Sequence, residues 1–352
     1  MIELFAGLLL LIAGAELMVR GAVRLAARLH VRPLIIGLTI VALGSSAPQM
    51  AVSLQATLAQ NADIAVGSVI GSCIFNILVT LGLSALIIPL RVSRQLVRLD
   101  IPLMIGASLL VFVLAWNKEL DRVDGLILLA ALVLYLGLLL RQSQHSARPP
   151  SHDETPKAPW VSSVLMIIVG LAMLVYAAHL LLGAAVAVAT DLGLSERIIG
   201  LTIVAISTSL PELATSLIAA LRGQRDIAVG NVIGSNLFNL LGVLGLTALV
   251  APSPLSVSPN ALDFDLPVML GVAVLCLPLF YTGYRVTRAE GLLFLGLYLA
   301  YGLHVVSFTT GMPLAGKLEH LMLFFVLPAL VAYLLFTSLR AWRRQHHKRE
   351  MP

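Results

Sequence analysis

The chain has 352 residues, of which 59% are hydrophobic and only 12% are charged. Soluble domains carry about 25% charged residues, so this composition excludes an ordinary soluble protein and a disordered chain alike. A net charge of +5 could suggest a nucleic-acid partner, but the basic residues stand in short clusters between apolar runs, and we expect no such partner.

Eleven apolar runs are long enough to cross a membrane, because a spanning helix needs about 20 residues. In chain order the predicted helices cover residues 2–19, 33–59, 64–90, 99–116, 124–140, 160–188, 197–221, 227–251, 264–283, 289–307 and 319–339. The first run has neither a short basic start nor a small-residue cleavage site, so we interpret it as a retained helix rather than a signal peptide. The sequence predicts an all-α polytopic membrane protein.

Basic residues are divided unequally between the loops on the two sides of the predicted membrane spans. When the N-terminus is placed outside, the outer loops hold only Lys118, Arg122, Arg197 and Lys317 of the 23 Lys and Arg residues. Cytoplasmic loops carry the excess of basic residues. We therefore predict an integral membrane protein with the N-terminus outside and the C-terminus cytoplasmic, and the compact chain favours a bacterial inner membrane.

A stretch rich in proline, serine and charge separates two halves of the chain. The predicted organisation is a five-helix half at 1–141, a cytoplasmic linker at 142–159, a second five-helix half at 160–308, and an extra helix with a basic tail at 309–352. The tail sequence RAWRRQHHKRE could bind anionic lipid. Anchoring by the positive-inside rule would explain it equally well.

The two halves contain an internal repeat. Residues 37–76 align without gaps to residues 200–239, and 24 of the 40 aligned positions are identical. Each half has an odd number of predicted helices, so the second copy enters the membrane from the opposite side. Such inverted repeats are a building plan of secondary transporters, and duplication for packing alone would not require the shared polar residues.

Four polar side chains of the repeat are predicted to meet near the membrane midplane. Gln49 and Asn76 lie 11 and 13 residues from the turn at 60–63, or roughly 17 to 20 Å along a helix. Glu212 and Asn239 lie equally far from the turn at 223–226 on the other side. All four therefore reach the middle of a hydrocarbon core about 30 Å thick.

Proline residues interrupt the helices beside these side chains. Pro48 and Pro211 each remove one backbone hydrogen bond and free a carbonyl one turn earlier. Together with the hydroxyls of Ser45, Ser46, Thr208 and Ser209, such carbonyls form the oxygen-rich surroundings that hard cations prefer. The small residues Gly71, Ser72, Gly234 and Ser235 are explained equally well by close helix packing and by direct ligation.

On these stretches, GSSAPQ with GSCIFN and STSLPE with GSNLFN, the sequence resembles the cation/calcium exchanger superfamily, which includes the sodium/calcium exchangers. The resemblance covers both halves and implies a ten-helix core, outside which the eleventh helix would lie. It also implies a cation site built from an acidic residue after each motif proline, the preceding hydroxyls and the residue that ends each GSN-type stretch. Carried over to this chain, the implied ligands are Ser45, Ser46, Gln49, Ser72, Asn76, Thr208, Ser209, Glu212, Ser235 and Asn239.

The chain departs from the pattern at Gln49, where calcium-transporting members commonly have Glu, and at the Asn76/Asn239 pair, which often holds another carboxylate. The resemblance implies secondary active cation antiport of the sodium/calcium exchanger type, with a metal bound mainly by Glu212, Asn76, Asn239 and Gln49. Because Glu212 is the only carboxylate of the expected site, exchange of Na⁺, H⁺ or another monovalent cation is the alternative. The transported cations are the expected partners, and we expect no cofactor.

Two other classes of protein compete with a transporter. An intramembrane aspartyl protease would need two mid-membrane aspartates, which the apolar runs do not offer, so we expect no enzyme. A membrane scaffold that transports nothing stays possible, because one acidic position is missing.

The sequence also supports predictions for several other polar residues and for the two cysteines. Asp63 and Asp226 could attract cations to the two entrances or could cap helices. Glu16 is expected to pair with Arg20. His179 is expected to be a satisfied interior histidine rather than a proton relay. The remaining expectations concern Asp100, Asp263 and Asp265 as caps or surface charges, and Cys73 and Cys276 as packing residues.

Overall fold

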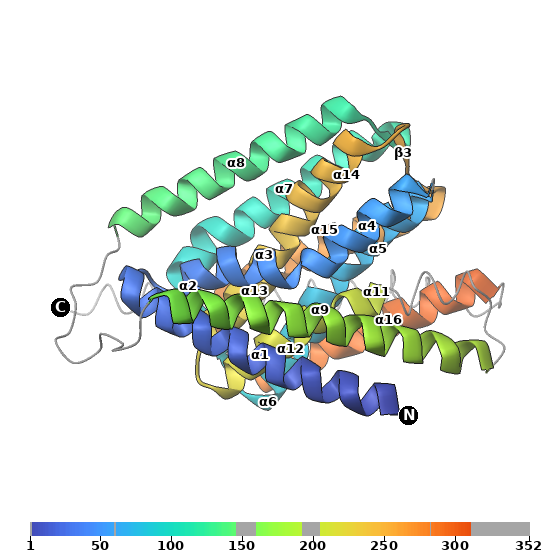
Figure 1. Cartoon of the computed structure of the whole chain (residues 1–352). Coiled ribbons are helices and arrows are strands. Elements are labelled where there is room, and N and C mark those ends of the chain that lie inside the picture. The colour runs from blue at the N-terminus through green and yellow to red at the C-terminus, as the bar shows by residue number, and fades with distance from the viewer. Residues whose placement is uncertain (1, 60, 146–159, 192–204, 282, 311–352) are drawn as a thin grey trace.

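The computed structural model describes residues 2–59, 61–145, 160–191, 205–281 and 283–310, and these are almost entirely helical (Figure 1). In the first half the helices are α1 (Ile2–Leu29), α2 (Pro33–Ile36), α3 (Ala42–Ser45), α4 (Ala47–Leu58), α5 (Ala62–Phe75), α6 (Gly82–Ile87), α7 (Ile101–Leu114) and α8 (Arg122–His145). In the second half they are α9 (Trp160–Asp191), α11 (Ala205–Thr208), α12 (Leu210–Leu221), α13 (Arg225–Leu237), α14 (Leu244–Val250), α15 (Leu266–Tyr281) and α16 (Arg288–Thr310).

Short π-helical segments join several of these helices into longer spans. They are η1 (Gly37–Val41), η2 (Asn76–Leu81), η3 (Leu96–Asp100), η6 (Phe238–Val243) and η7 (Ala261–Asp265), and one 3-10 turn is η4 (Ala115–Asn117). By length and composition, eight helices of the described residues can cross a membrane, or nine when the bent pair Pro33–Ser45 and Ala47–Leu58 is one span. The predicted helix at 197–221 is described only in part, and the one at 319–339 lies outside the described residues.

Several predicted helix boundaries differ from the structure. Helix α1 continues to Leu29, so Arg20, Arg24 and Arg28 lie on the helix and not in a loop as predicted. Helix α8 continues to His145, so the first residues of the predicted linker are helical. Helix α9 continues to Asp191, beyond its predicted end at residue 188. Polar and basic residues close to a span lengthen the helix because their side chains reach water while the backbone stays hydrogen-bonded.

Reciprocal contacts show that the two halves are related by a pseudo-twofold axis. Helix α6 packs on α16 where Gly82 meets Gly291, and a Cβ on Gly291 would lie 2.6 Å from the Gly82 carbonyl oxygen. The matching contact is between α14 and α8, where a Cβ on Gly125 would lie 2.7 Å from the Gly245 carbonyl oxygen. An interface in which each half gives the same element to the other is the signature of twofold symmetry.

Two short antiparallel strand pairs repeat this exchange. Strand β1 (Leu90–Arg91) pairs with β4 (Arg285–Val286), and β2 (Glu119–Leu120) pairs with β3 (Leu255–Ser256). Each pair joins one strand from each half. The strands therefore tie together loops that lie far apart in the sequence.

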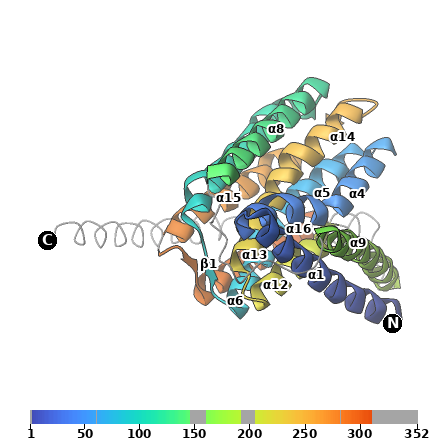
Figure 2. The same cartoon turned by 60° about the vertical axis from the view of Figure 1, so that its left-hand side comes forward.

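Helices α1 and α9 run side by side along one edge of the bundle (Figures 1 and 2). They touch where glycines replace side chains, since a Cβ on Gly170 would lie 2.7 Å from the Gly14 carbonyl oxygen. The buried centre of the molecule is formed instead by α5 with η2 and by α13 with η6.

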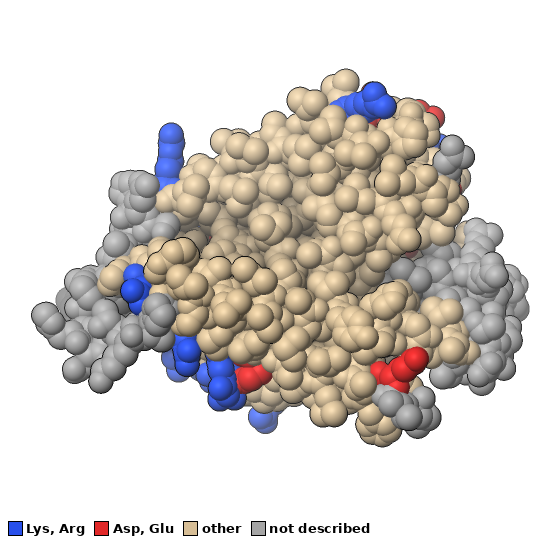
Figure 3. Space-filling view, viewed as in Figure 1, with Lys and Arg blue, Asp and Glu red and all other residues tan. Residues whose placement is uncertain are grey.

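Charged and apolar side chains are distributed over the surface as in a protein that spans a membrane. On the face seen in Figure 3, Lys, Arg, Asp and Glu gather at the margins and the broad middle is free of them. Large apolar side chains are exposed on the helices of the bundle, among them Leu9 of α1, Leu165 of α9 and Val133 of α8. Such an apolar surface is stable in lipid and not in water.

Candidate cation-binding site

Both proline motifs interrupt a helix in the same way. Helix α3 ends at Ser45 and α4 begins at Ala47, with a bend of 40° between the two helices of this span. Pro48 is the second residue of α4 and has no N–H to give to the preceding turn. In the other half α11 ends at Thr208, α12 begins at Leu210 and Pro211 is again the second residue. The breaks set both motif hydroxyl pairs at helix ends.

The candidate residues are all buried although every one is polar. The structure buries Ser45, Ser46, Gln49, Ser72, Asn76, Thr208, Ser209, Glu212, Ser235 and Asn239. Glu212 itself is 0% exposed. Asn76 opens the π-helical segment η2 and Asn239 lies in η6, and π-helical turns within helices are frequent at functional sites.

Hydrogen bonds between the repeats gather most of these side chains into one region. The Ser46 hydroxyl donates to Oε1 of Glu212 at 3.2 Å. The hydroxyls of Ser72 and Ser209 lie 2.7 Å apart, and Nδ2 of Asn239 donates to Oγ of Ser72 at 3.2 Å. Each of these bonds joins a first-half residue to a second-half residue.

The two serines Ser45 and Ser235 meet in the same way, with their hydroxyls 3.2 Å apart. Nδ2 of Asn76 donates to Oδ1 of Asn236 at 3.1 Å. Gln49 differs from the rest because its amide nitrogen bonds within the first half. Its Nε2 donates to Oγ of Ser68 at 2.9 Å and to Oγ of Ser53 at 3.2 Å.

Asn231, which aligns with Ser68 of the first half, was not among the predicted residues. Its Nδ2 donates to Oγ of Ser216 at 2.9 Å and to the Glu212 carbonyl at 3.3 Å, while its Oδ1 accepts from Ser45. Asn236 was also missed, and it donates to the Cys73 carbonyl at 3.2 Å. Both are polar residues inside the repeat, opposite Ser68 and Cys73 in the alignment, and that alignment was the signal that could have identified them.

Four buried oxygens of this region have no hydrogen-bond donor in the described part of the chain. They are Oε1 of Gln49, Oδ1 of Asn76, Oε2 of Glu212 and Oδ1 of Asn239. A buried acceptor without a partner costs about 1 to 3 kcal/mol. In the three amides the nitrogen is engaged while the oxygen is left over, which is the arrangement that a cation would complete, since hard cations take oxygen ligands.

Among the four left-over oxygens, only that of Glu212 belongs to a carboxyl group. No group of three or more His, Cys, Asp and Glu side chains that could hold a metal ion is found among the described residues. Glu212 is therefore accompanied by amides and hydroxyls. Such a donor set offers many oxygens and little charge.

The two predicted entrance residues are not helix N-caps. Asn61 precedes α5 and Gln224 precedes α13, so Asp63 and Asp226 lie in the first turns. Asp63 accepts a hydrogen bond of 2.7 Å from Ser256 of β3. Carboxylates in a first turn are favoured by the helix dipole, and their role at an entrance stays a prediction.

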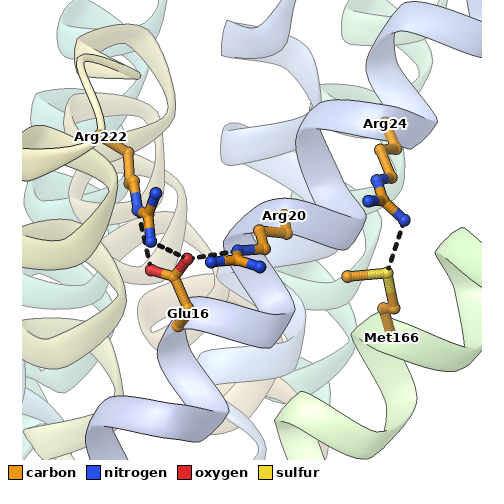
Figure 4. Close-up of polar contacts among 5 residues, drawn as sticks. All are labelled: Glu16, Arg20, Arg24, Met166 and Arg222. Carbon is orange, nitrogen blue, oxygen red and sulfur yellow. Dashed lines mark hydrogen bonds and ion pairs between the residues drawn. The ribbon is translucent and has the colours of Figure 1, made fainter. Parts of the chain in front are cut away.

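The pairing predicted for Glu16 is confirmed and extended. Glu16 forms an ion pair with Arg20 one turn on and also with Arg222 after α12 (Figure 4). His179 is exposed on α9, so the prediction of an interior histidine is wrong. Cys73 and Cys276 are buried free cysteines, as predicted.

The prediction for the three aspartates is only partly right. Asp263 is exposed. Asp265 accepts hydrogen bonds from Tyr301 and Asn260. Asp100 is 0% exposed and therefore is no surface charge; η3 packs against α7 and α15, which the linear sequence did not reveal.

Comparison with known proteins agrees with this architecture. The family described as sodium/calcium exchanger protein matches residues 2–141 and 162–307. The putative antiporter CaxA of Alkalimonas amylolytica is 38% identical over 309 residues, covering 85% of this chain and 96% of CaxA. The inner membrane protein YrbG of Escherichia coli is 37% identical over 281 residues, covering 77% of this chain and 86% of YrbG.

A solved structure of the sodium-calcium exchanger NCX_Mj superposes with a TM-score of 0.73 at 32% identity. The superposition covers 84% of this chain and 95% of that one. The expected helical exchanger fold is therefore confirmed. The matching family, CaxA and NCX_Mj are named as exchangers or antiporters, which confirms the expectation that the chain is a transporter and not an enzyme.

Proposed function

The chain belongs to the sodium/calcium exchanger family, and on that premise we propose that it exchanges cations at the region around Glu212. It is an integral membrane antiporter of that family. The proposal adds the position of the site and the nature of the ions. The site would lie near the midplane, between the two halves at 1–141 and 160–308, with Na⁺ as one of the exchanged cations.

One observation carries the proposal. Four buried oxygens from both halves, on Gln49, Asn76, Glu212 and Asn239, have no hydrogen-bond donor among the described residues. Buried polar groups normally have a hydrogen-bond partner, so four left-over acceptors in one region favour a ligand at that place. A cation drawn from water would receive oxygen ligands in exchange for its hydration shell.

The single carboxylate decides which cation binds well. At 4 Å and an effective dielectric constant of 20, one missing negative charge weakens the attraction to a divalent ion by about 8 kcal/mol before solvent and relaxation offset most of it. Ca²⁺ beside Glu212 would leave a net charge of about +1. A site with Gln at position 49 should therefore bind Ca²⁺ weakly.

A monovalent cation is favoured by the same observation. Na⁺ or a proton beside Glu212 would leave the site neutral, and a neutral site is the least costly one to bury at membrane depth. Exchange of Na⁺ for H⁺ is accordingly the second candidate function. Sodium/calcium exchange of reduced Ca²⁺ affinity remains the first, because family membership supports it.

Alternating access would use α1 and α9. These two helices pack along each other at the edge of the bundle, while the site residues belong to the buried repeat helices (Figures 1 and 2). We propose that the pair slides across the repeat helices and opens the site to one side at a time. The proposed orientation has the N-terminus outside and the C-terminus cytoplasmic.

The experiment is transport by the purified protein in liposomes. Uptake of radiolabelled Ca²⁺ is driven by an outward Na⁺ gradient, and in parallel a pH-sensitive dye reports proton flux under the same gradient. Each assay is repeated with Glu212→Gln and Gln49→Glu.

Uptake of Ca²⁺ that is lost in Glu212→Gln would support sodium/calcium exchange through one carboxylate. Proton flux without Ca²⁺ uptake, also lost in Glu212→Gln, would support the monovalent candidate. A folded protein that moves neither ion would contradict both and favour a scaffold.

A further inference from the structure

The thiol of Cys73 lies inside the region around Glu212. Cys73 belongs to α5, one turn before Asn76, and is 1% exposed. Its Sγ lies 3.9 Å from the Asn236 carbonyl oxygen. It also forms a side-chain hydrogen bond with Asn239 and interacts with the charge of the Glu212 carboxyl group. The prediction of a packing residue accounts for the burial of this cysteine but not for these polar contacts.

The repeat symmetry places the thiol at the centre of the molecule. Cys73 and Asn236 are related by the repeat, and each contacts the other, since Asn236 also donates to the Cys73 carbonyl oxygen at 3.2 Å. Two related residues that contact each other lie at the pseudo-twofold axis. Asn236 accepts a hydrogen bond from Asn76. The repeat-related contact is that of Cys73 with Asn239, so the thiol stands where the other half has a carboxamide.

Unsatisfied oxygens accompany the Cys73 thiol. Oδ1 of Asn239 and Oε2 of Glu212 are buried and have no hydrogen-bond donor among the described residues. Both belong to side chains that interact with Cys73. One sulfur and two oxygens are therefore left for a cation at this place. The second cysteine, Cys276, differs because its thiol donates to the Val272 carbonyl of its own helix at 3.5 Å.

The charge of the region indicates which cation would use the sulfur. Only Glu212 contributes a carboxyl group to the left-over oxygens, so a divalent ion bound by oxygens alone would keep about one uncompensated positive charge. A metal ion that binds sulfur displaces the thiol proton and gains a second negative ligand. Thiolate ligands select soft and borderline metal ions, whereas Ca²⁺ takes oxygen ligands.

We propose that Cys73 is a specificity-determining ligand of the Glu212 region, which binds a thiophilic divalent cation such as Cd²⁺ through the Cys73 sulfur and the oxygens of Glu212 and Asn239. When the cation binds, the S–H bond breaks, a metal–sulfur bond forms and the proton leaves to water. No electron is transferred, and the occupied site is neutral. This inference rests on the proposed function, because alternating access is what brings the cation to a buried thiol.

Ultraviolet absorption of the purified protein during titration with CdCl₂ tests the proposal, because a Cd²⁺–thiolate bond gives a charge-transfer band that oxygen ligands do not give. The chain has two cysteines, so Cys276→Ser leaves Cys73 as the only thiol and is the matched control for Cys73→Ser. The parent and Cys276→Ser should show the same band. Cys73→Ser should show none.

A band that disappears in Cys276→Ser would overturn the proposal, and so would a parent protein without a band or a Cys73→Ser protein with the parental band. The comparison of the parent with Cys276→Ser stays valid if Cys73→Ser fails to fold, because Cys73 is then the one thiol present.

Glu212→Gln tests whether the sulfur and the carboxyl group act in one site. The band should persist in this variant, since the sulfur is retained, but at least about tenfold more Cd²⁺ should be needed to reach it. An unchanged titration would place the metal away from Glu212 and contradict the proposal.

Inhibition of exchange in liposomes separates this inference from the proposed function. Cd²⁺ should inhibit Na⁺-driven exchange by the parent and by Cys276→Ser, and Cys73→Ser should require at least about tenfold more Cd²⁺. Exchange by a parent protein that shows no band would contradict the inference alone. A Cys73 band in a protein that moves no ion would contradict the proposed function alone.

Discussion

Nε of Arg222, the residue that follows α12, donates to Oε2 of Glu16 on α1 at 3.0 Å (Figure 4). This contact joins one of the two edge helices to the repeat helix that contains Glu212. The positions related to Glu16 and Arg222 by the repeat are His179 and Ala59, which cannot form an ion pair with each other. The contact is therefore present on one side of the pseudo-twofold axis alone.

Arg222→Gln should shift the balance between the two access states. Both side chains are partly exposed, 52% for Arg222 and 22% for Glu16, and an exposed ion pair contributes up to about 1 kcal/mol. Removing it should change the apparent Na⁺ affinities measured from the two sides of the liposome in opposite directions, by up to about fivefold.

The control for this experiment is Arg20→Gln, which removes a pair confined to α1. Its Na⁺ affinities should stay equal to those of the parent. An equal response of both variants would contradict a role of the contact between α1 and α12.

Glu212→Gln should abolish exchange while the protein keeps its fold. Glu212 supplies one of the four unsatisfied oxygens and is the one carboxyl group among them. Altering residues that only support a metal ligand already costs about 10- to 100-fold in affinity, so loss of the charged ligand itself should cost at least about 100-fold. Initial rates in liposomes measure the loss, and a normal melting temperature establishes folding. If this variant exchanged ions at the parental rate, a role of Glu212 in exchange would be excluded.

Gln49→Glu should raise the affinity for Ca²⁺ by about tenfold or more. It adds a second negative charge at a position whose oxygen is buried and unsatisfied, and an added charge attracts a divalent ion more than a monovalent one. Competition between Ca²⁺ and Na⁺ for uptake measures the effect. The swap Glu212→Gln/Gln49→Glu, which keeps one carboxylate, is the control and should not show this gain.

Asn231→Leu should destabilise the protein and impair exchange together. Asn231 holds Ser45, Ser216 and the Glu212 carbonyl by three hydrogen bonds, and an unpaired buried polar group costs about 1 to 3 kcal/mol. Thermal unfolding in detergent and initial exchange rates measure the two effects. Asn231→Ser, which copies the repeat-related Ser68, should retain more of both. Equal behaviour of the two variants would exclude a role for the hydrogen bonds.

Gly234→Val should prevent close packing of α13. A Cβ there would lie 2.7 Å from the Leu38 carbonyl oxygen and 2.7 Å from the Cβ of Ala42, and overpacking of this kind costs about 1 to 3 kcal/mol. The melting temperature should fall clearly. Gly106→Val on α7 is the control, because the glycine is exposed and a Cβ there would meet no atom of the described residues. A fall of equal size in the control would contradict the packing explanation.

The amino-acid sequence by itself determined the membrane class, the helical fold and the internal repeat. Long apolar runs can satisfy their backbone only as helices in lipid, so composition and length are sufficient. The repeat also pointed to Gln49, Asn76, Glu212 and Asn239, because polar residues at matching positions of two copies inside apolar helices are costly to keep without a purpose.

Only the tertiary structure decided which of these groups form hydrogen bonds with each other and which have no hydrogen-bond donor among the described residues. Hydrogen bonds such as Ser46 to Glu212 join residues 166 positions apart, and no local pattern encodes such a pairing. The same applies to Asn231 and Asn236, which the linear motifs did not distinguish from packing residues. It applies also to Asp100, which was expected as a cap or a surface charge and which the packed helices bury completely. Burial is a property of the packed helices, since the neighbours that exclude water come from distant parts of the chain.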